Sequence, residues 1–390
     1  MARFGVICEY NPLHGGHVYH LQCARAAGAD GIVCIMSGSF TQRAEPAMAH
    51  KYARAEAAIS CGADLVIELP FPYSAGSAEF FACGGVAAAD AFGCDTLFFG
   101  SESGDIDRLK ALAAASLSPD FKAQYDALIK TNIGTAAAYA KALSLVAGED
   151  VGALSNDLLG LAYCKAIASG GYNIQPLCTK RVGADYHAQT LTEGYPSATA
   201  LRKIYREDGF DALQAHLPAP TFEVLDRARQ KGELLGDSQA FGAALLAILR
   251  TLPAEQIEAA ALCASGLGAR IASAAHTATS LDELYALASH KSLPDAHVRR
   301  AVLYAALGIT EQDLRRTPAY FTVLAANAKG RQMLAGLRHT CPVPVVIKPA
   351  DAPDCRQRAL SDRADALYTL AMEKPQSSGF FKRFAPFMAL

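Results

Sequence analysis

Short apolar runs alternate with amphipathic stretches along the first two hundred residues. The apolar runs predict strands at Arg3–Glu9, Gly31–Met36, Ala63–Leu69, Thr96–Phe99 and Ile174–Val182. Each of the first four is followed by a loop rich in Gly, Pro or Ser and then by a helical pattern. This order favours right-handed crossovers and a parallel sheet that is buried on both faces.

The loops that follow these strands carry most of the unusual polar residues. They are Tyr10–Leu13, Ser37–Pro46, Pro70–Ser77 and Gly100–Asp105. In an open parallel sheet, ligands bind beyond the carboxyl ends of the strands. We therefore expect the functional site to lie among these loops.

The pattern changes to Ala- and Leu-rich helical stretches after a junction at Pro218-Ala219-Pro220. Helices are predicted at Ala240–Leu249, Pro253–Leu267, Leu281–Ala288 and Ala296–Leu307. A strand signal returns only at Pro342–Ile347. The chain is thus predicted to be an α/β protein, with a Rossmann-like domain over residues 1–212 and a mainly α-helical domain over residues 213–390.

The composition is typical of a cytoplasmic globular protein. With 51% hydrophobic and 19% charged residues among 390, the chain has ample material for packed cores and little for long disorder. The first residues lead directly into a predicted strand, and no stretch has the apolar length of a membrane helix. The eleven cysteines form no C-x-x-C pair, so we expect reduced thiols and neither disulfides nor a zinc site.

Charge is unevenly distributed along the chain. Residues 1–200 hold 13 Lys and Arg against 19 Asp and Glu, a net charge of −6, whereas residues 201–390 hold 23 against 19, a net charge of +4. A basic C-terminal part beside an acidic N-terminal part is consistent with a polyanionic partner.

The strongest chemical motif is His14-Gly15-Gly16-His17, which follows the first predicted strand and opens a predicted helix. Residues three apart project from the same face of a helical turn. Backbone N–H groups at a helix N-terminus attract anions, and glycine lets the backbone approach a ligand closely. The motif predicts a cradle for nucleotide phosphates, with both histidines aimed at the α-phosphate. The structural alternative is a helix cap with two surface histidines.

A second cluster opens a later predicted helix. Ser197 and Thr199 place hydroxyls near its N-terminus, and Arg202 lies one turn further on. These groups could hold the β- and γ-phosphates of a nucleotide and stabilise departing pyrophosphate. The alternative is an ordinary N-cap.

Six stretches together are far more specific than either motif alone. They are Cys8–His20, Met36–Ala47, Ala63–Pro72, Phe99–Glu102, Ser155–Asp157 and Ser197–Arg202. In these stretches the chain resembles the bacterial tRNA(Met) cytidine acetate ligase family of the H-x-G-H nucleotidyltransferase-like superfamily, and the resemblance covers almost the whole chain. It implies a HUP-type catalytic domain and an ATP-dependent ligase. Such an enzyme forms acetyl-adenylate from acetate and ATP and transfers the acetyl group to N4 of the wobble cytidine of elongator tRNA(Met).

The resemblance also implies roles for individual residues. Catalysis would rest on His14, His17, Ser197, Thr199 and Arg202. Contacts to ATP would come from Ile7, Cys8, Glu9, Tyr10, Asn11, Pro12, Leu13, His14, Gly15, Gly16, His17, Val18, Tyr19, His20, Gly100, Asn156 and Arg181. Mg²⁺ is expected with the ATP phosphates, with no protein ligand assigned to it.

The basic helical part supplies the candidates for tRNA binding, namely Lys291, Arg299, Arg300, Arg315 and Arg316. For any one of them, a solvated helix face is the alternative. Reversing two charges among these arginines should weaken tRNA binding and leave ATP affinity unchanged, because no contact is shared between tRNA and ATP.

The chain departs from the family pattern at three places. Gly15 stands where the family usually has asparagine, and Ser289–Leu293 is poorer in charge than the family's basic segment. Thr322 stands where the family has an arginine. Because two of these departures fall in the helical part, the ATP half is the firmer match.

Several polar residues have a structural alternative. Glu9 and Asn11 could order the nucleotide or the histidines, or could be ordinary turn residues. An ion pair between Arg43 and Glu45 within their loop is favoured over a ligand contact. Asp64 and Glu68 are interpreted as structural acceptors beside a buried strand.

Two other functions share parts of this pattern. A small-molecule adenylyltransferase of coenzyme metabolism would have the H-x-G-H half but needs no large basic helical domain. A non-catalytic RNA-binding protein could keep ATP as a structural ligand, although intact His14, His17 and Arg202 argue against it.

Overall fold

The computed structural model describes residues 1–131, 133–151, 155–181, 195–236, 238–263, 266–290, 293–337 and 340–389. The side chains of Ala136, Ser155, Asn156 and Ser238 lie outside that description. The strands are β1 (Arg3–Cys8), β2 (Gly31–Ser37), β3 (Leu65–Leu69), β4 (Thr96–Ser101), β5 (Gln175–Lys180), β6 (Phe321–Ala326), β7 (Val345–Val346) and β8 (Phe387–Met388).

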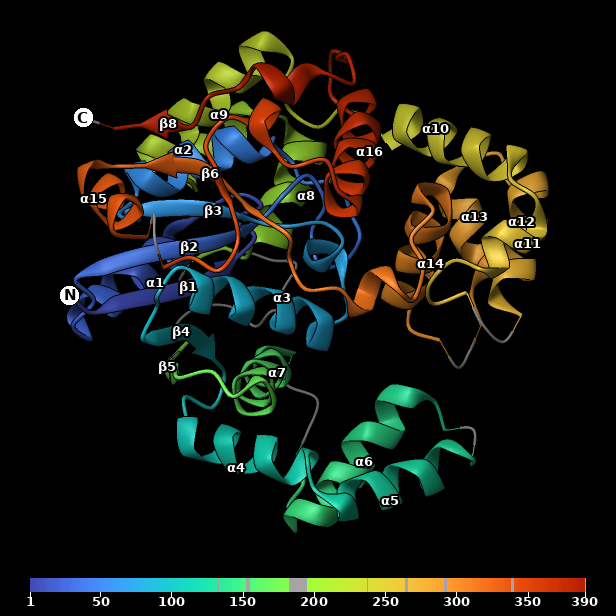
Figure 1. Cartoon of the computed structure of the whole chain (residues 1–390). Coiled ribbons are helices and arrows are strands. Elements are labelled where there is room, and N and C mark those ends of the chain that lie inside the picture. Colours follow the sequence, from blue (N-terminus) through green and yellow to red (C-terminus); the bar gives the residue numbers. More distant parts are fainter. Residues whose placement is uncertain are drawn as a thin grey trace.

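Helices cover both faces of the sheet and form a separate group beside it (Figure 1). In the first part of the chain they are α1 (Gly15–Ala26), α2 (Lys51–Ser60), α3 (Ala78–Ala91), α4 (Ile106–Ser116), α5 (Pro119–Ile129), α6 (Thr135–Ala147), α7 (Ser155–Gly170) and α8 (Ala198–Asp208). In the second part they are α9 (Ala219–Lys231), α10 (Ser238–Thr251), α11 (Ala254–Glu258), α12 (Leu267–Thr277), α13 (Leu281–Ala288), α14 (Asp295–Leu307), α15 (Ala328–Leu337) and α16 (Arg356–Leu370).

The sheet has the strand order β5-β4-β1-β2-β3-β6-β7, with β8 paired to β6. Strands β1 to β5 run parallel to one another, as the alternating pattern predicts. β6 joins the free edge of β3 in the antiparallel direction. The predicted α/β class with a Rossmann-like parallel sheet is therefore confirmed.

Alternate residues of the central strands pack into two different cores. Ile32, Cys34 and Met36 of β2 belong to the core that α1 and α2 help to form. Val33 and Ile35 belong to the opposite core, with residues of α3 and α7. Because successive side chains of a strand point to opposite faces, a wholly apolar strand such as β2 needs helices on both sides.

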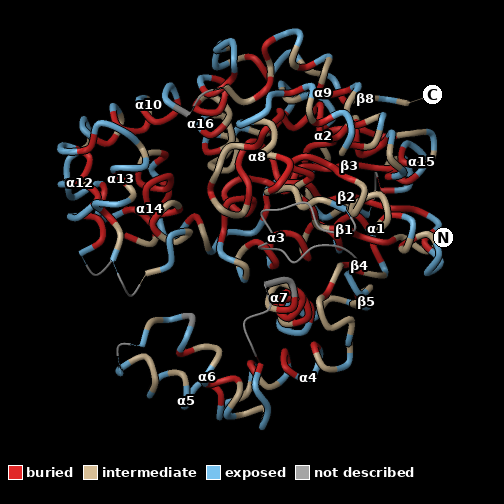
Figure 2. Tube along the Cα trace, turned by 180° about the vertical axis from the view of Figure 1, so that it is seen from behind, coloured by how far each residue is buried: buried red, intermediate tan, exposed pale blue. Residues whose placement is uncertain are grey.

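The second part of the chain first leaves the sheet and then returns to it. Helices α10 to α14 form a group beside the α/β body, and α16 lies between that group and the sheet in both views (Figures 1 and 2). Buried residues run along the central strands, whereas exposed ones predominate on the outer helices (Figure 2). The predicted domain boundary at residue 212 stays a prediction. In the structure, strands β6, β7 and β8 of the second part join the sheet of the first part.

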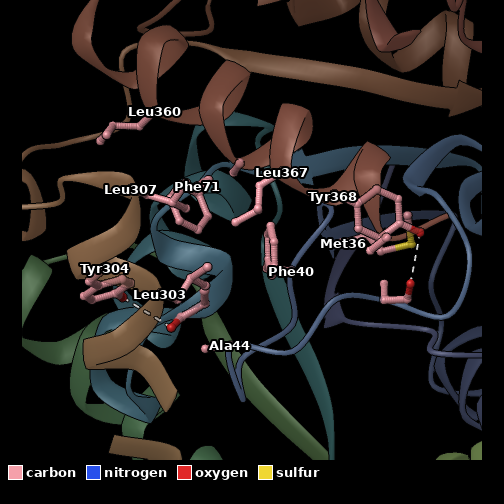
Figure 3. Packing of buried hydrophobic residues seen from close by; sticks show 14 of the residues in the cluster. Met36, Phe40, Ala44, Phe71, Leu303, Tyr304, Leu307, Leu360, Leu367 and Tyr368 are labelled. Atoms are coloured by element: carbon pink, nitrogen blue, oxygen red, sulfur yellow. Dashed lines mark hydrogen bonds between the residues drawn. The ribbon is translucent and has the colours of Figure 1, made fainter. Parts of the chain in front are cut away.

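Phe40, in the loop after β2, is where the helical group meets the sheet. Its ring lies 5.9 Å from Phe241 of α10, 6.2 Å from Phe71 after β3 and 6.4 Å from Tyr368 of α16. Leu303, Tyr304 and Leu307 of α14 and Leu360 and Leu367 of α16 belong to the same apolar cluster (Figure 3). The loop after β2 is therefore packed from outside by the second part of the chain.

The structure corrects two details of the predicted elements. The stretch Pro253–Leu267 is not one helix, because α11 ends at Glu258 and α12 begins at Leu267. Between them Leu262 has φ 66° and Gly266 has φ 83°, and residues in that left-handed region end a right-handed helix. Strand β6 was not predicted, and of the predicted Pro342–Ile347 only Val345 and Val346 form a strand.

Asp64 and Glu68 occupy the structural positions that the sequence favours. Asp64 Oδ2 accepts a hydrogen bond from the Ile32 N–H (2.8 Å), and Asp64 pairs with Arg25. Glu68 Oε1 pairs with the buried Lys51 Nζ (2.8 Å), which also pairs with Asp365 of α16 (2.8 Å). The ion pairs of Lys51 thus connect α2, β3 and α16, and the bonds of Asp64 connect α1 and β2 to the start of β3.

Candidate active site

A cavity of about 500 Å³ lies at the carboxyl ends of β1, β4 and β5. The strand order reverses at β1, because β2 and β3 extend to one side of it and β4 and β5 to the other. A topological switch point of this kind is where open α/β sheets bind ligands. The volume falls in the usual range for small-molecule sites, roughly 300–1,000 Å³.

The two histidines of the H-x-G-H motif form the start of α1 and line this cavity. His14 is the N-cap, and its Nδ1 accepts a hydrogen bond from the Gly16 N–H (3.1 Å). His17 Nδ1 accepts one from the His14 N–H (3.3 Å), and the ring centroids lie 3.9 Å apart. Because each Nδ1 accepts, the proton of each neutral ring sits on Nε2. Both residues therefore carry an Nε2–H donor.

Burial keeps these rings uncharged. It lowers the pKa of His14 to about 4, and the nearby positive charge of Arg181 contributes to the same shift. Burial also lowers the pKa of His17 well below its usual value, with His14 and Arg181 acting in the same direction. At neutral pH the motif thus presents two neutral N–H donors beside the cationic Arg181.

The second predicted cluster reaches the same cavity from α8. Ser197 is the N-cap of α8, with its Oγ accepting from the Ala200 N–H (3.1 Å). Arg202 Nη1 donates to the carbonyl oxygen of Asn11 (2.7 Å), and its Nη2 donates to Thr199 Oγ1 (3.3 Å). Ser197, Thr199 and Arg202 all line the cavity. The helix-cap interpretation and the ligand-site interpretation are therefore compatible here.

The segment between β1 and α1 is held by neighbouring loops. Tyr10 has φ 47°, which bulky residues rarely adopt, and its buried hydroxyl lies 3.4 Å from Cys34 Sγ. Asn11 Oδ1 accepts from the Met48 N–H (2.7 Å), and Glu9 Oε1 accepts from the Gln42 N–H (2.6 Å). The loop after β2 thus fixes the backbone that leads into the histidine motif.

Helix α14 holds the outer side of that loop. Arg300 donates from Nε (3.2 Å) and Nη2 (3.0 Å) to the carbonyl oxygen of Gln42. Arg299 pairs with Glu45 and lies over the Tyr285 ring. The expected ion pair of Glu45 with Arg43 was therefore wrong, because Glu45 pairs with Arg299. These bonds also join the second part of the chain to the cavity.

The β4 and β5 side of the cavity is lined by Gly100, Lys180 and Arg181. A Cβ at Gly100 would lie 3.2 Å from Arg181 Cγ, so glycine leaves room for that side chain. Asp157 of α7 accepts hydrogen bonds from Ser101 Oγ (2.5 Å) and the Glu102 N–H (2.9 Å). These bonds attach the start of α7 to the end of β4.

Most of the residues predicted to bind ATP line the cavity. They are Ile7, Cys8, Glu9, Tyr10, Asn11, His14, Gly16, His17, Tyr19, His20, Gly100 and Arg181. Pro12, Leu13, Gly15 and Val18 belong to the same turn and helix but are not among the lining residues. Asn156 lies in the first turn of α7, and its side chain is outside the described residues.

The cavity also has lining residues that the sequence did not single out. These are Thr41 and Gln42 after β2, Ala78 and Phe81 of α3, Phe99 of β4, Leu158, Leu159 and Tyr163 of α7, Thr179, and Tyr195 and Ala198 around the start of α8. Tyr195 has a related signal in the sequence, because a Cβ at Gly15 would overlap its ring. The departure from the family's asparagine at this position thus coincides with an aromatic ring over the turn.

The candidates for tRNA binding occupy different environments. Arg300 is buried and Arg299 is partly buried, and both hold the cavity loop as described above. Arg315 and Arg316 are exposed around a short 3₁₀ turn, with Arg316 3.7 Å from Asp313. Thr322 is buried in β6, and Lys291 lies outside the described residues.

Comparison with known proteins assigns this fold and cavity to a class. A family model described as HIGH Nucleotidyl Transferase matches residues 1–381. The tRNA(Met) cytidine acetate ligases of Acetivibrio thermocellus and Bacillus subtilis strain 168 are each 32% identical to the chain. The alignments cover 96% and 97% of this chain and 96% and 95% of those proteins.

Solved structures agree with this result. The crystal structure of Thermotoga maritima TmcAL without ligand superposes with a TM-score of 0.91 at 27% identity, and the form bound with alpha-thio ATP has a TM-score of 0.88. Both comparisons cover 100% of each chain. The chain is thus a HIGH-type nucleotidyl transferase in fold. It belongs to the tRNA(Met) cytidine acetate ligase family, a family of enzymes, which confirms the resemblance drawn from its motifs.

No helix in the described part of the chain is long and apolar enough to cross a membrane.

Proposed function

We propose that this protein condenses acetate with ATP to form acetyl-adenylate and then transfers the acetyl group to N4 of the wobble cytidine of elongator tRNA(Met). The observation that carries this proposal is the pair of neutral Nε2–H donors of His14 and His17 at a helix N-terminus in the switch-point cavity. The family's name supplies the acyl and RNA substrates, and the Thermotoga relative supplies the nucleotide. A reaction on tRNA places the enzyme in the cytoplasm.

Activation requires stabilisation of charge on phosphate. When an acetate oxygen attacks the α-phosphate of ATP, negative charge grows on the phosphate oxygens and pyrophosphate departs. Neutral donors and helix N–H groups stabilise that charge without having to reorganise. We assign His14 and His17 to the α-phosphate, and Gly100, Asn156 and Arg181 to contacts with the same nucleotide. Ser197, Thr199 and Arg202 are placed for the β- and γ-phosphates and for departing pyrophosphate. Mg²⁺ would arrive on these phosphates, and we assign no protein ligand to it.

Transfer requires the RNA to bring one base to the same cavity. An anticodon nucleotide can leave its stack, because loops of single-stranded RNA allow bases to splay out. We assign ATP and acetate chemistry to residues 1–212 and the positioning of tRNA to residues 213–390. Among the candidate arginines, Arg315 and Arg316 are the ones exposed to solvent and therefore accessible to RNA phosphates.

The decisive experiment supplies all three substrates. The purified protein is incubated with ATP, Mg²⁺, radiolabelled acetate and unmodified elongator tRNA(Met), and the tRNA is digested to nucleosides. We expect label in N4-acetylcytidine that depends on ATP, with AMP and pyrophosphate formed in equal amounts.

Two other outcomes would contradict the proposal. A small-molecule adenylyltransferase would exchange pyrophosphate with ATP only when its own acceptor is present, and acetate would have no effect. A non-catalytic RNA-binding protein would bind ATP and tRNA and form neither AMP nor labelled nucleoside.

A further inference from the structure

We propose that Glu9 is the general base of the transfer step, accepting a proton from the cytosine amino group as that amine attacks acetyl-adenylate. This role rests on the proposed function and assigns the proton acceptor that its second step requires. The chemistry of the cavity lining and the hydrogen bonds of Glu9 support it.

The Glu9 carboxylate is held at one oxygen and open at the other. It follows β1 directly and lines the cavity together with His14 and His17. Its Oε1 accepts from the Gln42 N–H (2.6 Å), while Oε2 makes no hydrogen bond to a described residue. A carboxylate in this state has a fixed orientation and a free lone pair, which are the properties of a positioned base.

The other lining groups are unsuited to accept this proton. His14 and His17 use Nδ1 as an acceptor and carry their protons on Nε2, so both rings are donors. His20 Nε2 is buried and has no hydrogen-bond partner among the described residues, but burial lowers the pKa of His20 to about 4, which makes this ring a weak base. Of the described lining residues, only Glu9 and Glu45 are carboxylates, and Glu45 is paired with Arg299. Of these two carboxylates, Glu9 is therefore the one that forms no ion pair with a described residue.

The charges around Glu9 leave it available as a base. Arg54 from α2 donates to the backbone carbonyl of Glu9 and to that of Ser37, so it is engaged by the backbone. Arg43 of the loop after β2 and Arg202 of α8 also act on the carboxylate, and Tyr163 of α7 lies near it. Burial nevertheless raises the pKa of Glu9 above its usual value, in spite of the arginines and the Gln42 N–H, which act in the opposite direction.

The transfer step releases one proton, so it requires a proton acceptor. The cytosine amine forms an N–C bond to the acetyl carbon, and the bond from that carbon to the AMP oxygen breaks. AMP leaves as an anion, and the nitrogen must lose one proton. Glu9 takes that proton and later releases it to water. A carboxylate is also the side chain that best accepts a hydrogen bond from the amino group of cytosine.

The test separates the two half-reactions in the full-length protein. Adenylation is measured as acetate-dependent exchange between ATP and pyrophosphate without tRNA. Transfer is measured in a single turnover from preformed acetyl-adenylate to unmodified elongator tRNA(Met). For Glu9→Gln we expect transfer slowed by roughly a hundredfold or more, the usual effect of a lost general base. Exchange should be slowed much less than transfer, because adenylation needs no proton acceptor at this position.

The pH profile and two further variants sharpen the result. Wild-type transfer should accelerate as pH rises through the pKa of Glu9, because the ionised form is the base, and Glu9→Gln should lose this limb. Glu9→Asp should recover part of the transfer rate. Glu79→Gln is the matched control, because Glu79 is exposed, pairs with Lys165 and does not line the cavity. We expect wild-type rates from it.

Each outcome either supports or overturns the assignment. Glu9→Gln that transfers like wild type would overturn it, as would a variant that loses exchange as severely as transfer. Should Glu9→Gln fail to fold, Glu9→Asp decides by the same comparison of transfer with exchange. A wild-type protein with neither exchange nor transfer would instead refute the proposed function itself.

Discussion

Replacing Arg300 with methionine should disturb the cavity loop without removing a tRNA contact. The guanidinium donates through Nε and Nη2 to the carbonyl oxygen of Gln42, and the residue is 8% exposed. The N–H of the same Gln42 holds Glu9. The substitution therefore removes the bonds that join α14 to Gln42, the residue that in turn holds Glu9 in the cavity.

The magnitude follows from the lost bonds. Hydrogen bonds with a charged partner contribute about 1.5–3 kcal/mol, and an unpaired buried carbonyl adds to the loss. Removing a buried charge offsets part of it, because the desolvation cost disappears as well. We expect a net loss of about 1–2 kcal/mol in the free energy of unfolding. Misplacement of the loop should slow acetyl transfer by roughly tenfold to a hundredfold.

The assay compares Arg300→Met with Arg250→Met. Arg250 makes the same type of bonds, from Nε to the Ala275 carbonyl (2.8 Å) and from Nη2 to the Ala278 carbonyl (2.6 Å), within the helical group. Urea denaturation should show a smaller loss of stability for Arg250→Met than for Arg300→Met, because Arg250 is exposed and Arg300 is buried. Only Arg300→Met should slow the reaction, and neither should change the salt dependence of tRNA binding.

One result would refute this reasoning. A phosphate contact contributes about 0.7–0.9 to the slope of log affinity against log salt concentration. If Arg300→Met lowered that slope by such an amount and left the transfer rate unchanged, Arg300 would be an RNA contact and the loop would not depend on it.

The remaining predictions concern the histidines, the RNA surface, the acyl donor and pH. His14→Ala or His17→Ala should lower kcat of acetate-dependent exchange by roughly a hundredfold and change ATP affinity little, because the charge they stabilise grows in the transition state; normal exchange in either variant would contradict the assignment. Reversing Arg315 and Arg316 to glutamate should lower the salt slope of tRNA binding by about 0.7–0.9 per lost contact, and leave ATP affinity unchanged; an unaltered slope would place the RNA surface elsewhere. Free acetate with ATP should acetylate the tRNA, and acetyl-CoA without ATP should not; product from acetyl-CoA alone would show a different reaction. Burial lowers the pKa of His14 and of His20 to about 4, so below pH ~6.5 the unfolded chain binds more protons than the folded protein. The free energy of unfolding should therefore fall between pH ~6.5 and pH 4, by up to about 1.4 kcal/mol per pH unit for each ring. Urea denaturation at pH 7 and pH 5 measures this fall, and His20→Asn should reduce it; an equal fall in that variant would assign it to other groups.

Local patterns were sufficient to predict the parallel sheet and the start of the site. An apolar run followed by a glycine-containing turn and an amphipathic stretch specifies strand, loop and helix by short-range rules, and all five predicted strands of the first part are present. The H-x-G-H motif is local in the same sense, because its capping bonds join residues two and three apart. The fold and the family of the protein could therefore be predicted from the sequence.

Contacts between distant residues decided the rest. The antiparallel strand β6 joins β3 from more than 250 positions away, and no short window records which edge a strand will join. The sequence around Arg300 is typical of an exposed helical arginine. Arg300 is buried because the loop after β2 packs against it and its guanidinium bonds to Gln42. The sequence by itself determined the elements and the phosphate motif, since those depend on neighbours along the chain. Only the tertiary structure decided which oxygen of Glu9 accepts a hydrogen bond, which arginines face solvent and where the second part of the chain contacts the cavity. Each of these depends on packing between segments that are far apart in the sequence.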